Sequence, residues 1–407
     1  MKFGAFVGKL VGRFMGKFAS TALLLAATLP AWAAAAPIDI VTGQAGVFIH
    51  LDASGRKSLA VSEGIVAIVW EDNRSGAPRC QLGLKSVAAA TFREYPLGKS
   101  ECFEPAVSAL DGGRFLLAWE DESGVNAALA NRSGPGPAAK LADSGGQATM
   151  AWHPKLGAFA AWTRPDGRWR RIWHTSLAID GAALKPGAIR PADLASPADD
   201  QLFPTLAAPD QGFALAWEDR RHGHTVIYGS RSGDGQAWTT PIRISGNPTG
   251  KAQGDLGRGT GAMRPVLASF GGRLAAAWLD KRDFLSGYDV YAALSDDGGA
   301  RFAKDSKAQD SFGDAIAQWH VAAAGNKRGD LMIAFDDERD GTADIWLTPL
   351  SRTGYGENTT LPAASGPGRQ TDPAIALDEA GNLHLAWLDQ GGEGTTRLRY
   401  TVWPLQK

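Results

Sequence analysis

Leu-Ala-Trp-Glu-Asp-Arg-Arg, residues Leu215–Arg221, is the stretch that decides the fold, because the chain repeats it in seven variants. Each copy joins a small apolar run to an aromatic residue, and an acid usually follows two positions later. Self-similarity at a long, regular period is typical of repeat architectures. The seven aromatic residues lie 43 to 61 residues apart and are Trp70, Trp119, Trp162, Trp217, Trp278, Phe335 and Trp387. This spacing matches the length of a four-stranded propeller blade.

One unit of the repeat is complete in the middle of the chain. Phe203–Ala208 predicts a short first strand, and Phe213–Trp217 predicts an apolar second strand of the kind that neighbouring sheets cover on both faces. Thr225–Gly229 and Ala237–Ile244 predict the third and fourth strands. By the same pattern the seven units begin near Lys57, Glu104, Gln147, Gln201, Arg264, Trp319 and Thr371.

The fold class that follows is all-β: a seven-bladed β-propeller built from four-stranded antiparallel blades. The third copy, Gln147–Gly181, is divergent, and a six-bladed ring is the alternative if this copy is an insertion. The last unit supplies only three strands before the chain ends, which would leave an open sheet edge. Ile38–Val41 has strand character and precedes the first unit, so we predict that it pairs there as the missing outer strand.

The N-terminus has the features of an export signal. Basic residues between Lys2 and Lys17 precede the apolar run Thr21–Pro30, and Ala31–Ala33 provides the small-x-small pattern that signal peptidase accepts. This apolar run is too short for a membrane-spanning helix. We therefore expect residues 1–36 to be removed and residues 37–407 to form a single propeller domain. That domain is expected in a periplasm or outside the cell, as a monomer without a membrane span.

The net charge and the cysteine content indicate which partners and which compartment to expect. The 407 residues carry a formal net charge of −1, which gives no electrostatic reason to expect a nucleic-acid partner. The two cysteines, Cys80 and Cys102, both lie in the exported part, where an oxidising compartment favours a disulfide. Cys80 is expected to begin the third strand of the first blade and Cys102 to follow its fourth strand. Both sulfurs would then lie at the same end of adjacent antiparallel strands.

One turn carries a motif that resembles a known family. The segment Ser295–Phe302 matches S-x-D-x-G-x-x-[WF], the Asp-box of the sialidase-like (BNR repeat) propellers, through Ser295, Asp297, Gly299 and Phe302. Asp297 is expected to accept backbone N–H groups across a tight turn, and Phe302 to fill the space between sheets. The resemblance covers the chain from about Lys57 onward and implies a sialidase-like propeller.

The repeated acids all belong to one end of the blades. Each ends a predicted second strand, whereas the Asp-box lies between third and fourth strands, and successive antiparallel turns alternate between the two ends. In sialidase-like propellers the end opposite the Asp-box binds the ligand. The resemblance therefore implies a ligand-binding face that carries Asp72, Arg74, Asp121, Asp219, Arg221, Asp280, Arg282, Asp337, Arg339 and Asp389.

Two interpretations of these Asp and Arg residues remain open at this point. In the first, each aspartate caps its own turn or pairs with the nearby arginine, which suits residues that recur in six of seven units. In the second, part of the set lines a central pocket for a polar ligand or for Ca²⁺, which takes oxygen ligands. No loop has the dense acidic spacing of a dedicated calcium loop, so we predict no metal site and no cofactor.

The resemblance also implies what a sialidase would need: three arginines, a Tyr nucleophile activated by a Glu, and an acid/base Asp. The family's aromatic-Arg-Ile-Pro run is missing from this chain. The weak catalytic candidates are Tyr288, in the long loop Asp283–Tyr288, with Asp280 and Arg282 before it. No Glu lies beside Tyr288 in the sequence.

The function predicted from the sequence is binding of a ligand, most consistent with a glycan, at the Asp/Arg face and without catalysis. An exo-acting, sialidase-like glycoside hydrolase is the alternative, and an interaction scaffold of the cell envelope is the second alternative.

Overall fold

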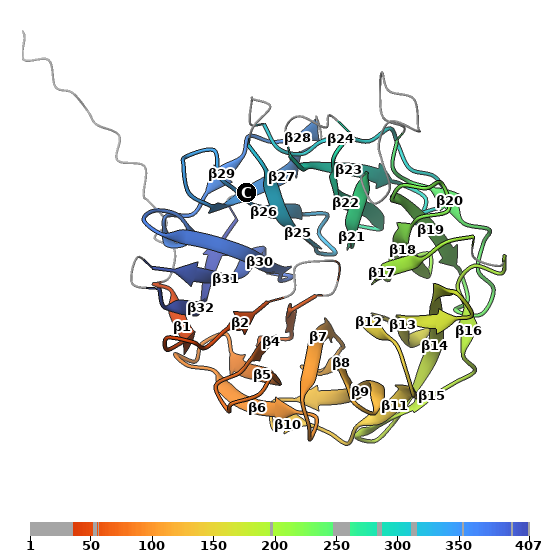
Figure 1. Ribbon diagram of the computed structural model, residues 1–407, viewed down its shortest axis with the longest axis horizontal. Coiled ribbons are helices and arrows are strands. Elements are labelled where there is room, and N and C mark those ends of the chain that lie inside the picture. Colours follow the sequence, from red (N-terminus) through yellow and green to blue (C-terminus); the bar gives the residue numbers. More distant parts are fainter. Residues whose placement is uncertain are drawn as a thin grey trace, which may run out of the picture. The chain divides into compact units, whose positions relative to one another are not determined.

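The computed structural model describes residues 36–51, 55, 57–195, 198–246, 261–282, 287–310, 316–351, 354–391 and 394–405. Residues 1–35, which hold nearly all of the predicted export signal, lie outside this part. The described residues form seven antiparallel sheets arranged around a common centre, as Figure 1 shows. Each sheet is one blade of the propeller.

The first four blades follow one another along the chain. Blade 1 contains β2 (Ile49–His50), β3 (Leu59–Ser62), β4 (Ile65–Asp72), β5 (Arg79–Ser86) and β6 (Arg93–Leu97). Blade 2 contains β7 (Cys102–Ala109), β8 (Phe115–Asp121), β9 (Gly124–Asn131), β10 (Gly134–Pro135) and β11 (Ala139–Ala142). Blade 3 contains β12 (Gly146–His153), β13 (Gly157–Asp166), β14 (Trp169–Asp180), β15 (Ala183–Pro186) and β16 (Arg190–Pro191). Blade 4 contains β17 (Gln201–Ala207), β18 (Phe213–Asp219), β19 (Val226–Ser232) and β20 (Ile242–Arg243).

Three further blades complete the ring. Blade 5 contains β21 (Ala262–Phe270), β22 (Arg273–Asp280), β23 (Asp289–Ser295) and β24 (Ser306–Lys307). Blade 6 contains β25 (Gln318–Gly325), β26 (Leu331–Asp337), β27 (Asp344–Ser351), β28 (Gly354–Tyr355) and β29 (Thr359–Thr360), and a 3-10 turn, η2 (Pro362–Ala364), follows it. Blade 7 contains β30 (Arg369–Leu377), β31 (Asn382–Gln390), β32 (Thr396–Pro404) and β1 (Ile38–Thr42).

The ring closes as predicted, through a strand from the beginning of the chain. β1 pairs antiparallel with β32, and Ile38 lies opposite Tyr400. In Figure 1 the two strands lie side by side although they come from opposite ends of the colour scale. The open edge of the last three-stranded unit is therefore covered, which confirms the expected role of this N-terminal segment.

The first strand of each blade lies innermost, and each of these strands contacts those of the two neighbouring blades, from β3 around to β30 and back to β3. The divergent third copy forms a complete blade, so the seven-bladed prediction is confirmed and the six-bladed alternative is wrong. The fourth strands are shorter than expected: β20 covers Ile242–Arg243 rather than Ala237–Ile244. This edge faces solvent, and water can satisfy its backbone groups.

The repeated aromatic residues fill the space between neighbouring sheets. Trp70, Trp217 and Phe335 are fully buried, and Trp119 is 3% exposed. One cluster of buried side chains joins Phe159 of blade 3 to Trp217 of blade 4, and the same pattern recurs between other neighbours. Burial of aromatic rings of this size dominates the packing energy of such an interface.

The predicted disulfide is also present. Cys80 on β5 bonds to Cys102 at the start of β7, with the two Cα atoms 5.3 Å apart. The bond therefore ties blade 1 to blade 2 at the end where second strands finish and third strands begin. Both cysteines are fully buried within the hydrophobic cluster between these blades.

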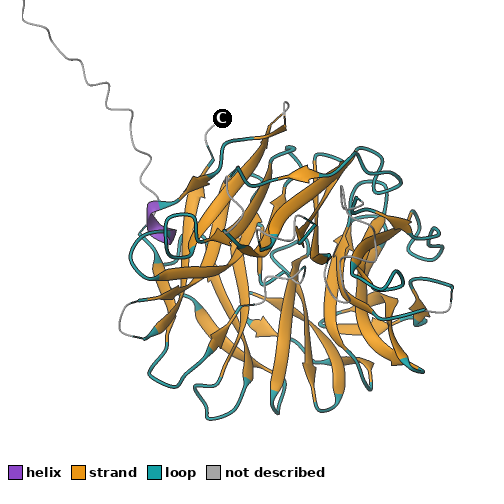
Figure 2. Cartoon of the chain, turned by 45° about the horizontal axis from the view of Figure 1, so that its top comes forward, coloured by secondary structure: helices purple, strands orange, loops and turns teal. Residues whose placement is uncertain are grey.

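The blade ends define two faces, which Figure 2 shows as loops at the two ends of the strands. We call the end with the second-to-third-strand turns, such as that after Asp280, the acid face, and the end with the Asp-box turn the box face. In the Asp-box, Ser295 Oγ donates to Asp297 Oδ1 at 2.9 Å, and the backbone N–H of Arg301 donates to the same oxygen at 2.9 Å. These bonds are the turn chemistry that the motif predicts. Phe302 packs against the cluster between blades 4 and 5.

Candidate functional site

The aspartates of the repeated phrase are turned toward their own blades. Trp70 Nε1 donates to Asp72 Oδ2 at 2.7 Å, and the backbone N–H of Arg74 donates to Asp72 Oδ1 at 3.1 Å. The same pair of bonds recurs at Asp219 and Asp280. The side chains of Asp72, Asp219, Asp280 and Asp337 are each at most 4% exposed. Each carboxylate therefore caps the turn that follows it.

The accompanying arginines tie these turns to more distant acids. Arg282 forms ion pairs of 2.5 Å with both Asp280 and Asp305, and its guanidinium lies over the Tyr291 ring. Arg221 connects its turn to Asp193 in the same way, and Arg74 connects its turn to Glu94. Burial alone would lower the pKa of Arg282, but its bonds to the two carboxylates raise it. Ion pairs at such buried positions hold loop geometry.

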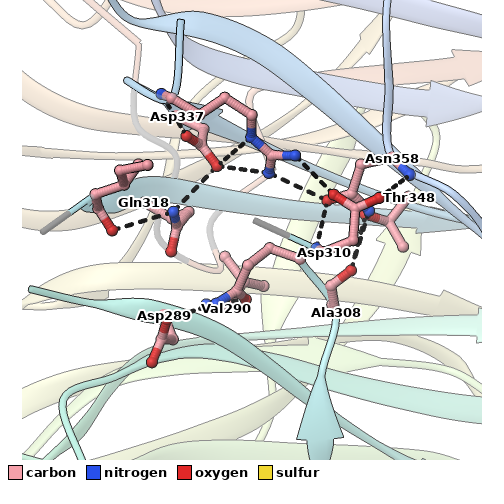
Figure 3. A network of polar contacts seen from close by, with 11 residues as sticks. Asp289, Val290, Ala308, Asp310, Gln318, Asp337, Thr348 and Asn358 are labelled. Carbon is pink, nitrogen blue, oxygen red and sulfur yellow. Dashed lines mark hydrogen bonds and ion pairs between the residues drawn. The ribbon is translucent and has the colours of Figure 1, made fainter. Parts of the chain in front are cut away.

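Figure 3 shows this arrangement at blade 6. Arg339 binds Asp337 at 2.6 Å and Asp310 at 2.6 Å, and Asp310 accepts the backbone N–H of Asn358 at 2.9 Å. Asn358 Nδ2 in turn donates to Thr348 Oγ1 at 2.7 Å. This series of bonds joins the turn after Asp337 to the connection from blade 5 and to the outer edge of blade 6.

The two remaining members of the predicted set have similar partners. Asp121 accepts bonds from the backbone N–H of Ser123 at 2.8 Å and from Asn126 Nδ2 at 2.9 Å. Although burial acts in the opposite direction, these bonds lower the pKa of Asp121. Asp389 pairs with Arg399 at 2.7 Å. The whole set thus has internal partners, and further polar side chains lie at the same face.

Those side chains begin with the middle residue of the repeated phrase, because strand side chains alternate between faces. Glu71, Glu120 and Glu218 lie between the Trp and the Asp of their copies and point to the other side. Glu71 Oε2 accepts the backbone N–H of Glu104 at 3.4 Å, and Glu218 Oε1 accepts that of Arg264 at 2.7 Å. Each acid therefore reaches the first strand of the next blade. The signal for these acids in the sequence is the Glu that directly follows the Trp in three copies of the repeat.

The receiving residues share an unusual backbone. Among the described residues, six blades carry one non-glycine residue with φ between 49° and 58° near the start of the first strand, and in each case the strand register shifts there. This left-handed conformation is costly for residues other than glycine and clusters at functional sites. We call these residues the bulge ring: Glu104, Gln147, Phe203, Arg264, His320 and Asp372.

Members of the bulge ring contact one another around the axis. Gln147 Oε1 accepts the backbone N–H of Phe203 at 2.8 Å, and the guanidinium of Arg264 lies 3.4 Å from the centroid of the Phe203 ring. His320 Nε2 lies 3.5 Å from Asp372 Oδ1. These contacts join blade 3 to blade 4, blade 4 to blade 5 and blade 6 to blade 7 at the acid face.

Electrostatics at this centre are strongly perturbed. Burial raises the pKa of Glu218 from 4.5 to about 6, against the opposing effect of Arg264 and Arg220. Burial would lower the pKa of His320, but its bonds to Asp336, with Nδ1 2.9 Å from Oδ2, raise it to about 9. The centre therefore holds a carboxyl group that titrates near neutral pH and a persistent imidazolium. Perturbed pKa values of this kind cluster at functional sites.

Tyr288 lies close to this centre, whereas the other two sequence candidates do not act with it. Its ring packs on Trp319 at 4.9 Å between centroids, and burial together with the charge of Glu218 raises its pKa. The sequence places no Glu beside Tyr288, but the charge of Glu218, in the preceding blade, acts on it. A raised pKa keeps the phenol protonated, which is opposite to the activation that a nucleophile needs. Asp280 and Arg282 are buried in their mutual ion pair.

A polar cavity of about 270 Å³ lies at the same face between blades 2 and 3. Its lining includes Glu104 and Gln147 of the bulge ring, with Glu120 and Arg170. In the described part of the chain, no group of three or more His, Cys, Asp or Glu side chains is placed to hold a metal ion. Nor does any helix of the described residues have the length and apolar character to cross a membrane.

No protein-family model and no curated protein matches this chain. Solved structures do share its fold. A protein of unknown function from Dyadobacter fermentans is 10% identical, with a TM-score of 0.54 over 92% of this chain and 99% of that one. The polysaccharide lyase Uly1 is 9% identical, with a TM-score of 0.56 over 86% and 90%. The α-L-arabinofuranosidase Arb93A from Fusarium graminearum is 11% identical, with a TM-score of 0.50 over 91% and 98%.

Proposed function

We propose that this chain is an exported propeller that binds a glycan at the centre of its acid face. The observation that carries this proposal is the bulge ring. A residue with a purely structural role in a repeat recurs as the same residue type, as the aspartates and arginines of the turns do. The bulge ring instead holds Glu, Gln, Phe, Arg, His and Asp at six equivalent, strained positions. The strained backbone is the same at all six positions, but the side chains differ. We infer that these side chains are selected for contact with a ligand rather than for the fold.

The surroundings suit a carbohydrate. Trp319 is 38% exposed beside Tyr288, and an aromatic surface of this kind can pack against the C–H face of a sugar ring. Carboxylates, the His320 imidazolium and the Arg264 guanidinium lie around it to bond hydroxyl or carboxylate groups. Two of the structurally similar proteins are named for action on glycans, a polysaccharide lyase and an arabinofuranosidase. The buried disulfide fits an oxidising compartment, in agreement with the export that the N-terminus predicts.

A glycan array followed by calorimetry on the best hit tests the proposal. Arg264→Gln and Asp372→Asn should each weaken binding at least tenfold, about 1.4 kcal/mol, because each removes a charge from the site. Arg301→Gln is the matched control, since this arginine lies on the box face with its side chain 88% exposed. The proposal is wrong if the bulge-ring variants bind as the parent protein does, or if no glycan binds.

Glycoside hydrolysis is the second candidate, and one observation favours it. Glu218 is buried and its pKa of about 6 is raised above that of an ordinary carboxyl group, so part of it keeps the proton that a general acid must donate at mildly acidic pH. Release of 4-methylumbelliferone from sialyl and neutral glycosides tests this candidate. Turnover that is lost in Glu218→Gln and kept in Glu94→Gln would support it; Glu94 lies on the outer strand β6. Absence of turnover across the panel would reject it and leave binding as the function.

A further inference from the structure

The axis of the propeller holds a second feature, separate from the acid face. Gly55, between β2 and β3, has a φ of +75°. A Cβ at this position would overlap the carbonyl oxygen of Pro265 and would lie 3.0 Å from the Cβ of Thr205. Pro265 and Thr205 belong to the first strands of blades 5 and 4, across the ring from blade 1. Gly55 therefore packs closely against the first strands of blades 4 and 5.

On the box-face side of Gly55 lies a cavity of about 180 Å³, with a smaller one of about 20 Å³ next to it. The walls come from the ends of the first strands of all seven blades and consist mostly of Ala, Leu, Ile and Val side chains. Lys57 lines both cavities and is the one charged residue among the described lining residues. Ser108 and Ser269 add hydroxyl groups to the wall of the larger cavity.

Lys57 is unusual among the charged groups of this protein. Nearly every other charge near the axis is paired, whereas no described residue forms a hydrogen bond or ion pair with the Lys57 ammonium. Burial alone lowers its pKa to about 8, and no carboxylate offsets this effect. Lys57 is half-buried, and an ammonium group that is partly withdrawn from water with no partner among the described residues carries a desolvation cost. A bound anion would remove that cost.

We propose that this axial cavity binds a small organic carboxylate, with Lys57 as its counter-ion. The Lys57 ammonium matches the charge of a carboxylate, whereas a phosphate, monovalent or divalent, would place additional oxygens against an apolar wall that offers them few donors. The apolar walls suit a short hydrocarbon part, and the two serines can donate to a carboxylate oxygen. Sites for drug-sized ligands measure about 300–1,000 Å³, so this cavity takes a smaller molecule. It lies on the box-face side of Gly55 and is independent of the proposed glycan site.

Calorimetry with butyrate, butyramide and inorganic phosphate at pH 6.5 tests the proposal. Butyrate should bind, and butyramide, which has the same shape without the charge, should bind at least tenfold more weakly. Raising the pH to 9.5 should weaken butyrate binding by about tenfold or more, because the ammonium then loses its proton. Equal binding of the amide, preference for phosphate, or no butyrate binding in the millimolar range would each overturn the proposal.

Lys57→Met removes the charge and keeps most of the side-chain volume. It should abolish butyrate binding, while Lys140→Met, at an exposed lysine of blade 2, should leave it unchanged. Loss of an unpaired buried charge should also keep Lys57→Met at least as stable as the parent protein. Butyrate binding that persists in Lys57→Met would contradict the assignment. If this variant does not fold, the comparison of butyrate with butyramide and the pH dependence still decide the question.

Discussion

The guanidinium of Arg264 stacks on the ring of Phe203, 3.4 Å from its centroid, and each residue comes from the strained bulge of its own blade. The φ angles are 55° and 50°, so two left-handed residues in neighbouring blades combine to build one contact. Cation–π contacts of this kind contribute about 0.5–2 kcal/mol, which offsets part of the backbone strain. The bulges therefore place side chains at the axis that an unbroken strand would direct elsewhere.

The strain at Phe203 predicts an inverted order of stability for two substitutions. Phe203→Gly should be more stable than Phe203→Ala by about 1 kcal/mol, because glycine adopts positive φ without the cost that a Cβ imposes. Urea unfolding of both variants measures the difference. Ala207→Gly, later in the same strand and at ordinary φ, should show the usual order and lose about 1 kcal/mol. Equal stability of the two Phe203 variants would mean that the bulge carries no strain.

The raised pKa of Glu218 predicts that removal of its charge increases the free energy of unfolding, and that this increase depends on pH. Its folded pKa, about 6, lies above its ordinary value of 4.5, so the folded state binds the proton more tightly and stability falls as pH rises between these values. Glu218→Gln should therefore be more stable than the parent protein by up to about 2 kcal/mol at pH 7.5 and should show no gain at pH 4. Thermal unfolding at the two pH values measures this. A loss of stability at pH 7.5 would contradict it.

His320 predicts a dependence of the same sign at higher pH. Its folded pKa of about 9 exceeds the ordinary 6.5, so its stabilising contribution is complete below pH 6.5 and is lost as pH rises through about 9. An NMR titration of the imidazole should show a midpoint well above 6.5, and Asp336→Asn should move it down toward that value. His222 serves as the internal control, because burial lowers its pKa and it has no contact with Asp336. A His320 midpoint at or below 6.5 would refute the ion pair.

Arg282 predicts a large loss of stability from a single change. Arg282→Met would leave Asp280 and Asp305 buried without their partner, which should destabilise the fold by about 3–5 kcal/mol. Arg301→Met, at a side chain that is 88% exposed, should change stability by less than about 1 kcal/mol. Guanidinium unfolding compares the two. Similar effects of both substitutions would show that the turns do not depend on their arginines.

The disulfide predicts a difference between oxidised and reduced protein. The Cys80→Ser, Cys102→Ser double variant should lose roughly 3 kcal/mol of stability, because the bond shortens the accessible loop of the unfolded chain. Unfolding of the parent protein with and without dithiothreitol should reproduce the same loss. If the reductant destabilises the double variant equally, the effect does not come from the bond.

Much of the architecture could be predicted from the sequence, because each copy of the repeat marks a second strand and the number of copies equals the number of blades. The buried Trp217 and the capped Asp219 follow from the same local rule. The bulge ring could not be predicted, because its backbone is set by pairing between strands and its side chains share no residue type. The effect of the Glu218 charge on Tyr288 likewise acts between blades, and no local pattern records it.

The pairing of β1 with β32 gives this molecule a seam, the one blade whose strands are not contiguous in the chain. Strand Ile38–Thr42 can take its place only after Thr396–Pro404 has been synthesised, so the ring stays open until the last blade has been made. A circular permutation that places the chain ends in another blade would move the closure to that blade without changing any side chain at the axis.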